Sequence, residues 1–544
     1  MSDANQRTQA ASPPAAPPVS VREAVPYMLA SALLALSQGL GQGFVSANVP
    51  QIAGDLGATT TEATWLMAAY LIPRASLPLM LIKIRTQFGL RRFAEVGVVA
   101  YVVVAFAALW VDDLRSAVIL QFLSGIAAAP LSTLAFLYML EKLPPPLKLT
   151  LGLPLALAVI FSGANLARVV SPALLGDSGM LWIHLTTLGL AMVSLMLVYL
   201  MPLTPVPRQK VIRTLDLTSF ALIASGFGGL TISFIMGPIH WWTDAPWIGW
   251  LMVASVAVLT LVAVVELHRK APLLDIRWIT SPEILHLTGA LLLLRLLMAE
   301  QATGAPRLMS ALGVGNGQLA ALFSLIVLAT FLGALACVAL MRPGREPHFH
   351  LVALLLIATG AFMDSHATAL TRPEQMYISQ TLIAFAAMLF LPPAMMAGLM
   401  KAMAKGPAYL LSFIVVFLST QLLGSVMASG LFTTLVNHRQ ALHLQILREQ
   451  LTATDPAALS MIAHGTRMAQ GQLSDAAAAQ GQAISQIASM MTREATVMAY
   501  DDAYFLIFLV ALGGAAALLL HVLRDLLSAR IEARRAPSNS EPTS

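Results

Sequence analysis

The chain has 544 residues, of which 58% are hydrophobic and only 11% are charged, and its mean hydropathy is +0.76. Too few polar groups are present to cover a soluble globule of this size, so a water-soluble protein is excluded and lipid is the main solvent. The net charge of +5 does not by itself indicate a nucleic-acid partner, because the positions of the charges are more informative than their sum. We therefore expect a lipid bilayer, and no nucleic acid, around this chain.

Fourteen apolar stretches predict an all-α polytopic membrane protein with 14 transmembrane helices. A helix of about twenty residues crosses the roughly 30 Å hydrocarbon core and leaves no backbone group without a hydrogen bond. The predicted spans begin near Pro26, Ala63, Ala94, Ala117, Leu149, Leu181, Leu215, Ile248, Glu283, Gln318, His350, Gln375, Pro407 and Ala503. Prolines and charges interrupt the spans near Leu149 and Glu283, which makes these two the least regular.

Two basic segments divide the spans into groups of six, two and six. The first runs from Pro202 to Thr214 and the second from His268 to Trp278. The predicted regions are a disordered cytoplasmic tail at 1–25, an N-terminal six-helix half at 26–202, a linker with two extra helices at 203–282, a C-terminal six-helix half at 283–524 and a cytoplasmic tail at 525–544. Most of the 32 Lys and Arg residues then fall on one side of the membrane, so the positive-inside rule predicts that both termini are cytoplasmic.

One long polar segment, at 437–500, interrupts the C-terminal half and is predicted to be a periplasmic loop that contains two helices. Thr454, Asp455 and Pro456 have the pattern of a helix start, and Ser474 with Asp475 has the same pattern. In the second helix Ile484, Ile487 and Met491 recur on one face. The pair therefore either packs as a cap on the outer face of the protein or docks on a partner.

Four ionisable residues fall well inside predicted spans, namely Arg74, Arg168, Arg295 and Glu300. A charge at mid-bilayer costs on the order of 3 kcal/mol or more, so such residues normally face a cavity or a partner. Glu300 is the candidate proton carrier, or else a structural counter-ion for an arginine on another helix, with Arg74 or Arg168 as the expected partner. Arg295 lies about 140° away from Glu300 around an ideal helix, so these two do not meet. The excess of arginine favours an amphipathic anion as substrate.

Several chemistries have no sequence signal here. The single cysteine, Cys337, excludes an internal disulfide, and no cluster of His, Cys and carboxylate residues has the spacing of metal ligands. No phosphate-binding loop and no serine nucleophile motif is present. We therefore expect no enzyme activity, no cofactor and no metal.

Motifs in order along the chain carry a family resemblance. They are Val49 to Gly57, Trp65, Tyr70, Gly89 to Arg92, Ser124 with Gly125 and Pro130, Ser171 to Gly176, Gln421 to Ser425, Asn437 to Arg439 and Ala495 to Asp502. Together they resemble the major facilitator superfamily, and within it the fourteen-span drug:proton antiporter branch of EmrB-type multidrug efflux permeases. The resemblance implies the major facilitator fold, in which two six-helix halves rock around a substrate site between them.

The same resemblance implies secondary active export of drugs or organic compounds, driven by protons, from the bacterial inner membrane. EmrB-type pumps of Gram-negative cells work with a periplasmic adaptor protein and an outer-membrane channel, so the 437–500 loop is a candidate adaptor contact. The candidates for lining the substrate cavity are Arg74, Arg168, Arg295, Gln42 and Gln121. Two alternatives remain open, an uncoupled facilitator or importer of a small organic anion and a non-transporting membrane scaffold.

Four positions depart from the family pattern. The usual span-one aspartate is replaced by Gly41, the span-four arginine by Gln121, the span-thirteen arginine by Thr420 and the loop aspartate by Thr86. The usual proton-coupling residues are therefore largely absent, and any proton carrier must lie elsewhere in the chain.

Overall fold

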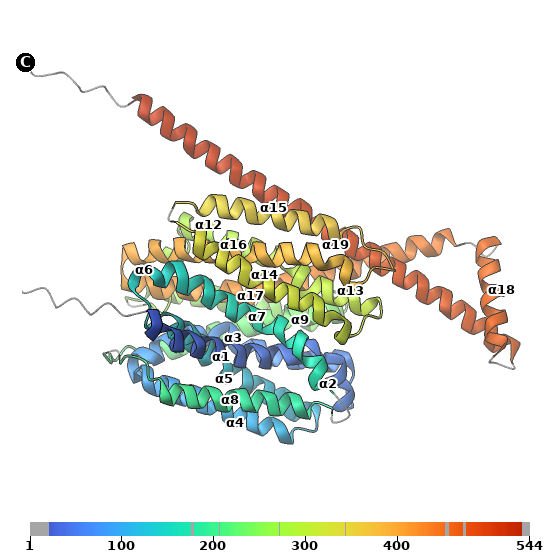
Figure 1. Ribbon diagram of the computed structural model, residues 1–544, viewed down its shortest axis with the longest axis horizontal. Helices are drawn as coiled ribbons and strands as arrows, with labels where there is room; N and C mark the ends of the chain where they lie inside the picture. The colour runs from blue at the N-terminus through green and yellow to red at the C-terminus, as the bar shows by residue number, and fades with distance from the viewer. Residues whose placement is uncertain are drawn as a thin grey trace, which may run out of the picture.

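The computed structural model describes residues 21–175, 179–205, 207–270, 272–342, 344–451, 456–471 and 475–535. Fourteen helices in these residues are long and apolar enough to cross a membrane, which confirms the predicted all-α architecture and its 14 spans. Figure 1 shows them side by side in one bundle. We call the end where the first span begins and the last span finishes the terminal end of the bundle.

The N-terminal half contains spans one to six. Its spans are formed by α1 (Val21–Ala47), α3 (Thr60–Phe88), α4 (Leu90–Ala107), α5 (Leu114–Glu141), α7 (Leu153–Leu174) and α8 (Leu181–Leu200), with short helices α2 (Val49–Asp55) and α6 (Pro145–Leu147) between them. α1 packs closely along α7. A Cβ atom on Gly39 would lie only 2.9 Å from Gly163 Cα, so glycine is what permits this approach. The first span begins at Val21 rather than at the predicted Pro26, and the rest of the predicted tail lies outside the described residues.

The C-terminal half contains spans nine to fourteen. It is built from α12 (Pro282–Leu297), the π-helical turn η3 (Glu300–Gly304), α13 (Ala305–Ala311), α14 (Asn316–Leu340), α15 (Glu346–Asp364), α16 (Tyr377–Lys405), α17 (Pro407–Gln450) and α19 (Ala476–Arg535). The halves meet where α7 packs on α14 and where α3 packs on α17. These contacts join one half to the other along two helix pairs.

The two spans that looked least regular in sequence each contain a π-helical turn. Lys148–Gly152 precedes α7, and Glu300–Gly304 separates α12 from α13. A π turn widens the helix by one residue and is frequent at functional sites. The candidate proton carrier Glu300 is the first residue of the second turn.

The two extra spans, α9 (Thr214–His240) and α10 (Pro246–His268), form a pair in which α9 touches both halves. α9 packs on α3 of the N-terminal half and on α17 of the C-terminal half. A Cβ atom on Gly430 of α17 would lie 2.3 Å from the carbonyl oxygen of Phe234 on α9, so the backbones are close. At the same end of α9, the Trp242 Nε1–H donates to Thr434 Oγ1 at 2.9 Å.

The long polar segment at 437–500 is helical and extends beyond the bundle. α17 continues to Gln450, α18 spans Pro456–Gln470, and α19 runs from Ala476 through the last span to Arg535. In Figure 1 this helical extension projects from the bundle at the end opposite the terminal end and does not cap it.

Both predicted helix starts in the extension agree with the described residues. α18 begins at Pro456, and Asp475 Oδ1 accepts a hydrogen bond from the Ala477 N–H at the start of α19. The residues expected to precede them, Thr454, Asp455 and Ser474, lie outside the described residues. Near its start, α19 packs on α18 through Ala479 and Ala483, whereas Ile484 is exposed. The small alanine side chains let α18 approach closely at Gly465.

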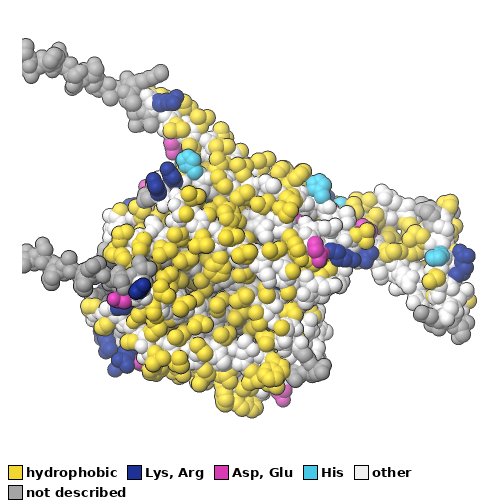
Figure 2. Space-filling model, viewed as in Figure 1, with side chains coloured by type: hydrophobic (Ala, Val, Ile, Leu, Met, Phe, Trp, Pro, Cys, Tyr) yellow, Lys and Arg dark blue, Asp and Glu magenta, His cyan; other side chains and the backbone are white. Residues whose placement is uncertain are grey.

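The surface agrees with a membrane environment. Figure 2 shows a broad apolar belt across the middle of the bundle, with charged side chains gathered toward its ends. Large apolar side chains such as Val96, Trp250 and Leu328 are exposed in this structure, in which no membrane is present. An exposed apolar belt of this extent requires lipid around it.

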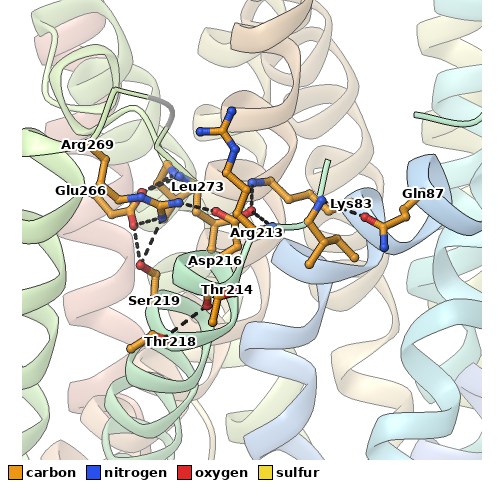
Figure 3. Close-up of polar contacts among 12 residues, drawn as sticks. Lys83, Gln87, Arg213, Thr214, Asp216, Thr218, Ser219, Glu266, Arg269 and Leu273 are labelled. Carbon is orange, nitrogen blue, oxygen red and sulfur yellow. Dashed lines mark hydrogen bonds and ion pairs between the residues drawn. The ribbon is translucent and has the colours of Figure 1, made fainter. Parts of the chain in front are cut away.

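A network of buried charges lies at the terminal end, where α3, α9 and the end of α10 meet (Figure 3). The Asp216 carboxylate binds Lys83 Nζ at 2.7 Å and Arg269 Nη2 at 2.5 Å, and Arg269 Nη1 also binds Glu266 Oε1 at 2.6 Å. Burial alone would lower the pKa of Arg269, but hydrogen bonds to the two carboxylates outweigh burial and raise this pKa. The network therefore fixes the extra helices to the N-terminal half.

The substitution Asp216→Asn tests this network. It removes the charge that faces two partly buried cations, so we expect the free energy of unfolding to fall by about 3 kcal/mol. Thermal unfolding of the purified protein in detergent measures the change. Asp244→Asn, at an exposed acid on the loop between α9 and α10, is the control and should leave the midpoint unchanged. Equal midpoints for wild type and Asp216→Asn would contradict the role given to the network.

Candidate functional site

Two of the predicted cavity arginines lie where the halves meet, and each contacts an aromatic ring of the opposite half. Arg168 on α7 places its guanidinium 5.2 Å from the ring centre of Phe323 on α14. Arg295 on α12 lies 4.7 Å from the ring centre of Phe161 on α7. Cation–π contacts of this kind compensate part of the cost of removing a guanidinium from water. The structure thus brings Arg168 and Arg295 to the interface between the halves.

Arg295 has a polar neighbour with an unused donor. Its Nε–H donates to Gln421 Oε1 on α17 at 2.8 Å, and its Nη2 binds the same oxygen. The Gln421 side-chain nitrogen is buried and has no hydrogen-bond partner in the part of the chain that the structure describes. A guanidinium and a free amide N–H side by side are both hydrogen-bond donors, which suits an anionic or carbonyl oxygen.

Arg74 is held inside the N-terminal half by neutral groups. Its Nη1 donates to Gln42 Oε1 at 2.7 Å and to Tyr70 Oη at 2.9 Å, and its Nη2 donates to Ser132 Oγ at 3.0 Å. These partners come from α1, α3 and α5, so Arg74 and Gln42, both predicted cavity residues, are in direct contact. Within the described residues, no carboxylate forms an ion pair with Arg74, Arg168 or Arg295.

Glu300 is fully buried inside the C-terminal half, beside a second acid that the sequence analysis did not identify. Glu300 is 0% exposed and Asp364, the last residue of α15, is 4% exposed. The Gln380 side-chain amide contacts both carboxyl groups and so places them next to each other. We call Glu300 and Asp364 the carboxyl pair. Gln380 on α16 donates to Asp364 Oδ2 at 2.7 Å and lies 3.5 Å from Glu300 Oε1.

The expectation that Arg74 or Arg168 partners Glu300 is wrong. Arg74 is bonded within the N-terminal half and Arg168 stacks at the interface, whereas the partners of Glu300 are all in the C-terminal half. The structure confirms that Arg295 and Glu300 do not meet, because Arg295 turns to Gln421 and Glu300 turns to Asp364. Asp364 was missed because it ends a span and is followed by polar residues, a pattern typical of a solvated loop.

Gln121 lies apart from the arginines, at a cavity of about 380 Å³ within the N-terminal half. The cavity wall includes Gly41, Tyr101, Gln121 and His184, from α1, α4, α5 and α8. Gly41 is the position at which the family pattern has an aspartate, and a Cβ atom there would lie 2.9 Å from Tyr101 Oη. The Tyr101 hydroxyl in turn donates to the Ser37 carbonyl at 2.9 Å, so this tyrosine occupies the space that a larger span-one residue needs.

Curated proteins similar to this chain include named export proteins. Multidrug export protein EmrB of Escherichia coli (strain K12) is 26% identical over 269 residues, which is 48% of this chain and 50% of EmrB. Fatty acid resistance protein FarB of Neisseria gonorrhoeae is 27% identical over 238 residues, or 42% and 45% of the two chains. The chain therefore spans about half the length of the curated relatives it matches. No family model matches the chain.

Solved structures extend the likeness to nearly the whole chain. The human organic anion transporter MFSD10 superposes with a TM-score of 0.55, at 13% identity, over 91% of this chain and 100% of MFSD10. A POT family transporter in complex with a thioalcohol-conjugated peptide gives a TM-score of 0.55, at 14% identity, over 91% and 96% of the two chains. The chain has the major facilitator fold and is related to EmrB-type export proteins. This confirms the resemblance drawn from the motifs.

The substitution Gly41→Ala tests whether Tyr101 occupies the span-one position. The added methyl group would collide with Tyr101 Oη, so we expect a loss of stability of roughly 1–3 kcal/mol, as for other overpacked interiors. Thermal unfolding in detergent measures it. Gly189→Ala on α8, where a Cβ atom meets nothing within 4 Å, is the matched control and should be neutral or slightly stabilising. The account fails if Gly41→Ala costs no less when Tyr101 is also changed to Phe.

Proposed function

We propose that this chain is a secondary active exporter of amphipathic organic compounds in a bacterial inner membrane, with anions as its preferred substrates. Its fold and its relation to export proteins support transport by alternating access of the two halves. The names of two similar proteins, a fatty acid resistance protein and an organic anion transporter, support an anionic substrate.

The observation that carries the anion assignment is the pair of interface arginines without carboxylate partners. Arg168 and Arg295 stack on Phe323 and Phe161 of the opposite half, and the unused Gln421 amide lies beside Arg295. An anion entering between the halves would bind the guanidinium groups, and its apolar part would replace the phenyl rings as their neighbour. Lipophilic cations would meet uncompensated positive charge here.

Proton coupling in this proposal depends on Glu300, because the span-one position has glycine. The proposed cycle exchanges a proton for the substrate, with both termini in the cytoplasm. The helical extension formed by α17, α18 and α19 supports a further proposal, that a periplasmic adaptor protein leading to an outer-membrane channel binds there. The absence of an acid at Gly41 favours a second candidate, an uncoupled facilitator or importer of a small organic anion.

Transport in proteoliposomes tests the anion assignment. The probe is a fluorescent alkyl sulfonate, which stays charged and does not cross lipid unaided, and ethidium is the cationic comparison. We expect Arg168→Gln and Arg295→Gln each to reduce sulfonate transport by about tenfold or more, because a charged hydrogen bond contributes about 1.5–3 kcal/mol. Arg115→Gln, at an exposed arginine at the start of α5, is the matched control.

Two outcomes would contradict the proposal. Faster transport of ethidium than of the sulfonate would overturn the anion assignment. Sulfonate transport that ignores an imposed pH gradient, with undiminished counterflow, would favour the uncoupled facilitator over the proton-driven exporter.

A further inference from the structure

The carboxyl pair is a buried acid cluster without a counter-ion. Within the described residues, no Lys, Arg or His forms an ion pair with Glu300 or Asp364. Two buried carboxylates that lie beside the same amide nitrogen, at low dielectric, repel each other too strongly for both to be ionised. The pair therefore holds at least one proton.

The surrounding donors distinguish the two acids. Asp364 accepts hydrogen bonds from Ser379 Oγ and Gln380 Nε2, which stabilise a negative charge on its oxygens. Glu300 Oε2 is buried and has no hydrogen-bond partner in the neighbouring side chains. The charge consequently belongs on Asp364 and the proton on Glu300. Such coupled acids titrate as one unit.

The elements that pack around the pair bring polar and aromatic side chains to it. η3 itself brings Gln301, which binds the Gln380 carbonyl at 2.8 Å, and α17 brings the Phe432 ring. α19 brings Tyr504, whose buried hydroxyl has no hydrogen-bond partner among the described residues. A Cβ atom on Gly304 would lie 2.8 Å from the Tyr504 ring, so glycine in η3 is what admits this tyrosine.

We propose that Glu300 and Asp364 together form the binding site for a single exchangeable proton, with Asp364 as the charged partner and Tyr504 as the neighbouring hydroxyl through which the proton is exchanged. The assignment of this proton to transport rests on the proposed function. The site joins spans nine, eleven, twelve and fourteen through η3, α15, α16 and α19. Loss of the proton leaves two adjacent negative charges, which push η3 away from α15.

Infrared difference spectroscopy of the purified protein tests the site without any substrate. A pH titration should reveal one buried protonated carboxyl group in the carbonyl region, and isotope-labelled glutamate should shift its band. Glu300→Gln should abolish the band, and Asp364→Asn should shift its frequency and its titration midpoint. Glu283→Gln, at an exposed glutamate near the start of the same span, is the matched control and should leave the band unchanged.

Transport of the sulfonate probe separates this inference from the proposed function. In wild type a pH gradient should drive accumulation, whereas Glu300→Gln and Asp364→Asn should lose accumulation at least tenfold and retain counterflow. A wild type that transports nothing contradicts the proposed function, while the infrared band still decides the proton site. A band that survives Glu300→Gln, or one that disappears on adding sodium chloride at constant pH, overturns the proton site.

Discussion

Hydrocarbon neither hydrogen-bonds nor screens charge, and this constraint governs how the buried ionisable side chains of the described residues are paired. The protein meets it in different ways at different depths. At the terminal end, Asp216 is neutralised by full ion pairs with Lys83 and Arg269. Deeper in the bundle, arginines rest on aromatic rings or neutral oxygens, and the acids share a proton. The terminal network therefore has the fixed, compensated character of a structural brace, whereas the deeper groups do not.

The buried charged groups that lack an ion-pair partner among the described residues lie in two places, the interface between the halves and the interior of the C-terminal half. Arg168 and Arg295 each depend on a ring of the opposite half, so their surroundings must change whenever the halves separate. The carboxyl pair depends on η3, a helical turn that is already irregular. The substrate charge would act at the interface between the halves, and the proton would act inside the C-terminal half. Span nine connects the two places, because α12 carries Arg295 and η3 carries Glu300. This arrangement gives a physical route by which binding of one ligand affects the other.

Apolar length and loop charge were enough to predict the spans, because hydrocarbon thickness permits few alternatives. The resemblance in motifs added the fold. The cavity candidates were partly predictable, since a buried arginine has to border an interface or a polar partner, as Arg295 and Arg74 do. Side-chain pairing was not predictable: Asp364 looks like a loop residue in sequence, and only the packing of α15 against α16 buries it beside Glu300. The continuation of α17 and α19 out of the bundle was not predicted from sequence, because a polar helix beyond the membrane has the composition of a loop.

The central claim is that Glu300 and Asp364 act as one unit, and a double-mutant cycle tests it most directly. Unfolding of wild type, Glu300→Gln, Asp364→Asn and the double variant in detergent gives the coupling energy between the two side chains. The account predicts that the second substitution costs much less than the first, with a coupling of about 1 kcal/mol or more. Additive effects of the two substitutions would show that the acids do not share a proton and would contradict the account.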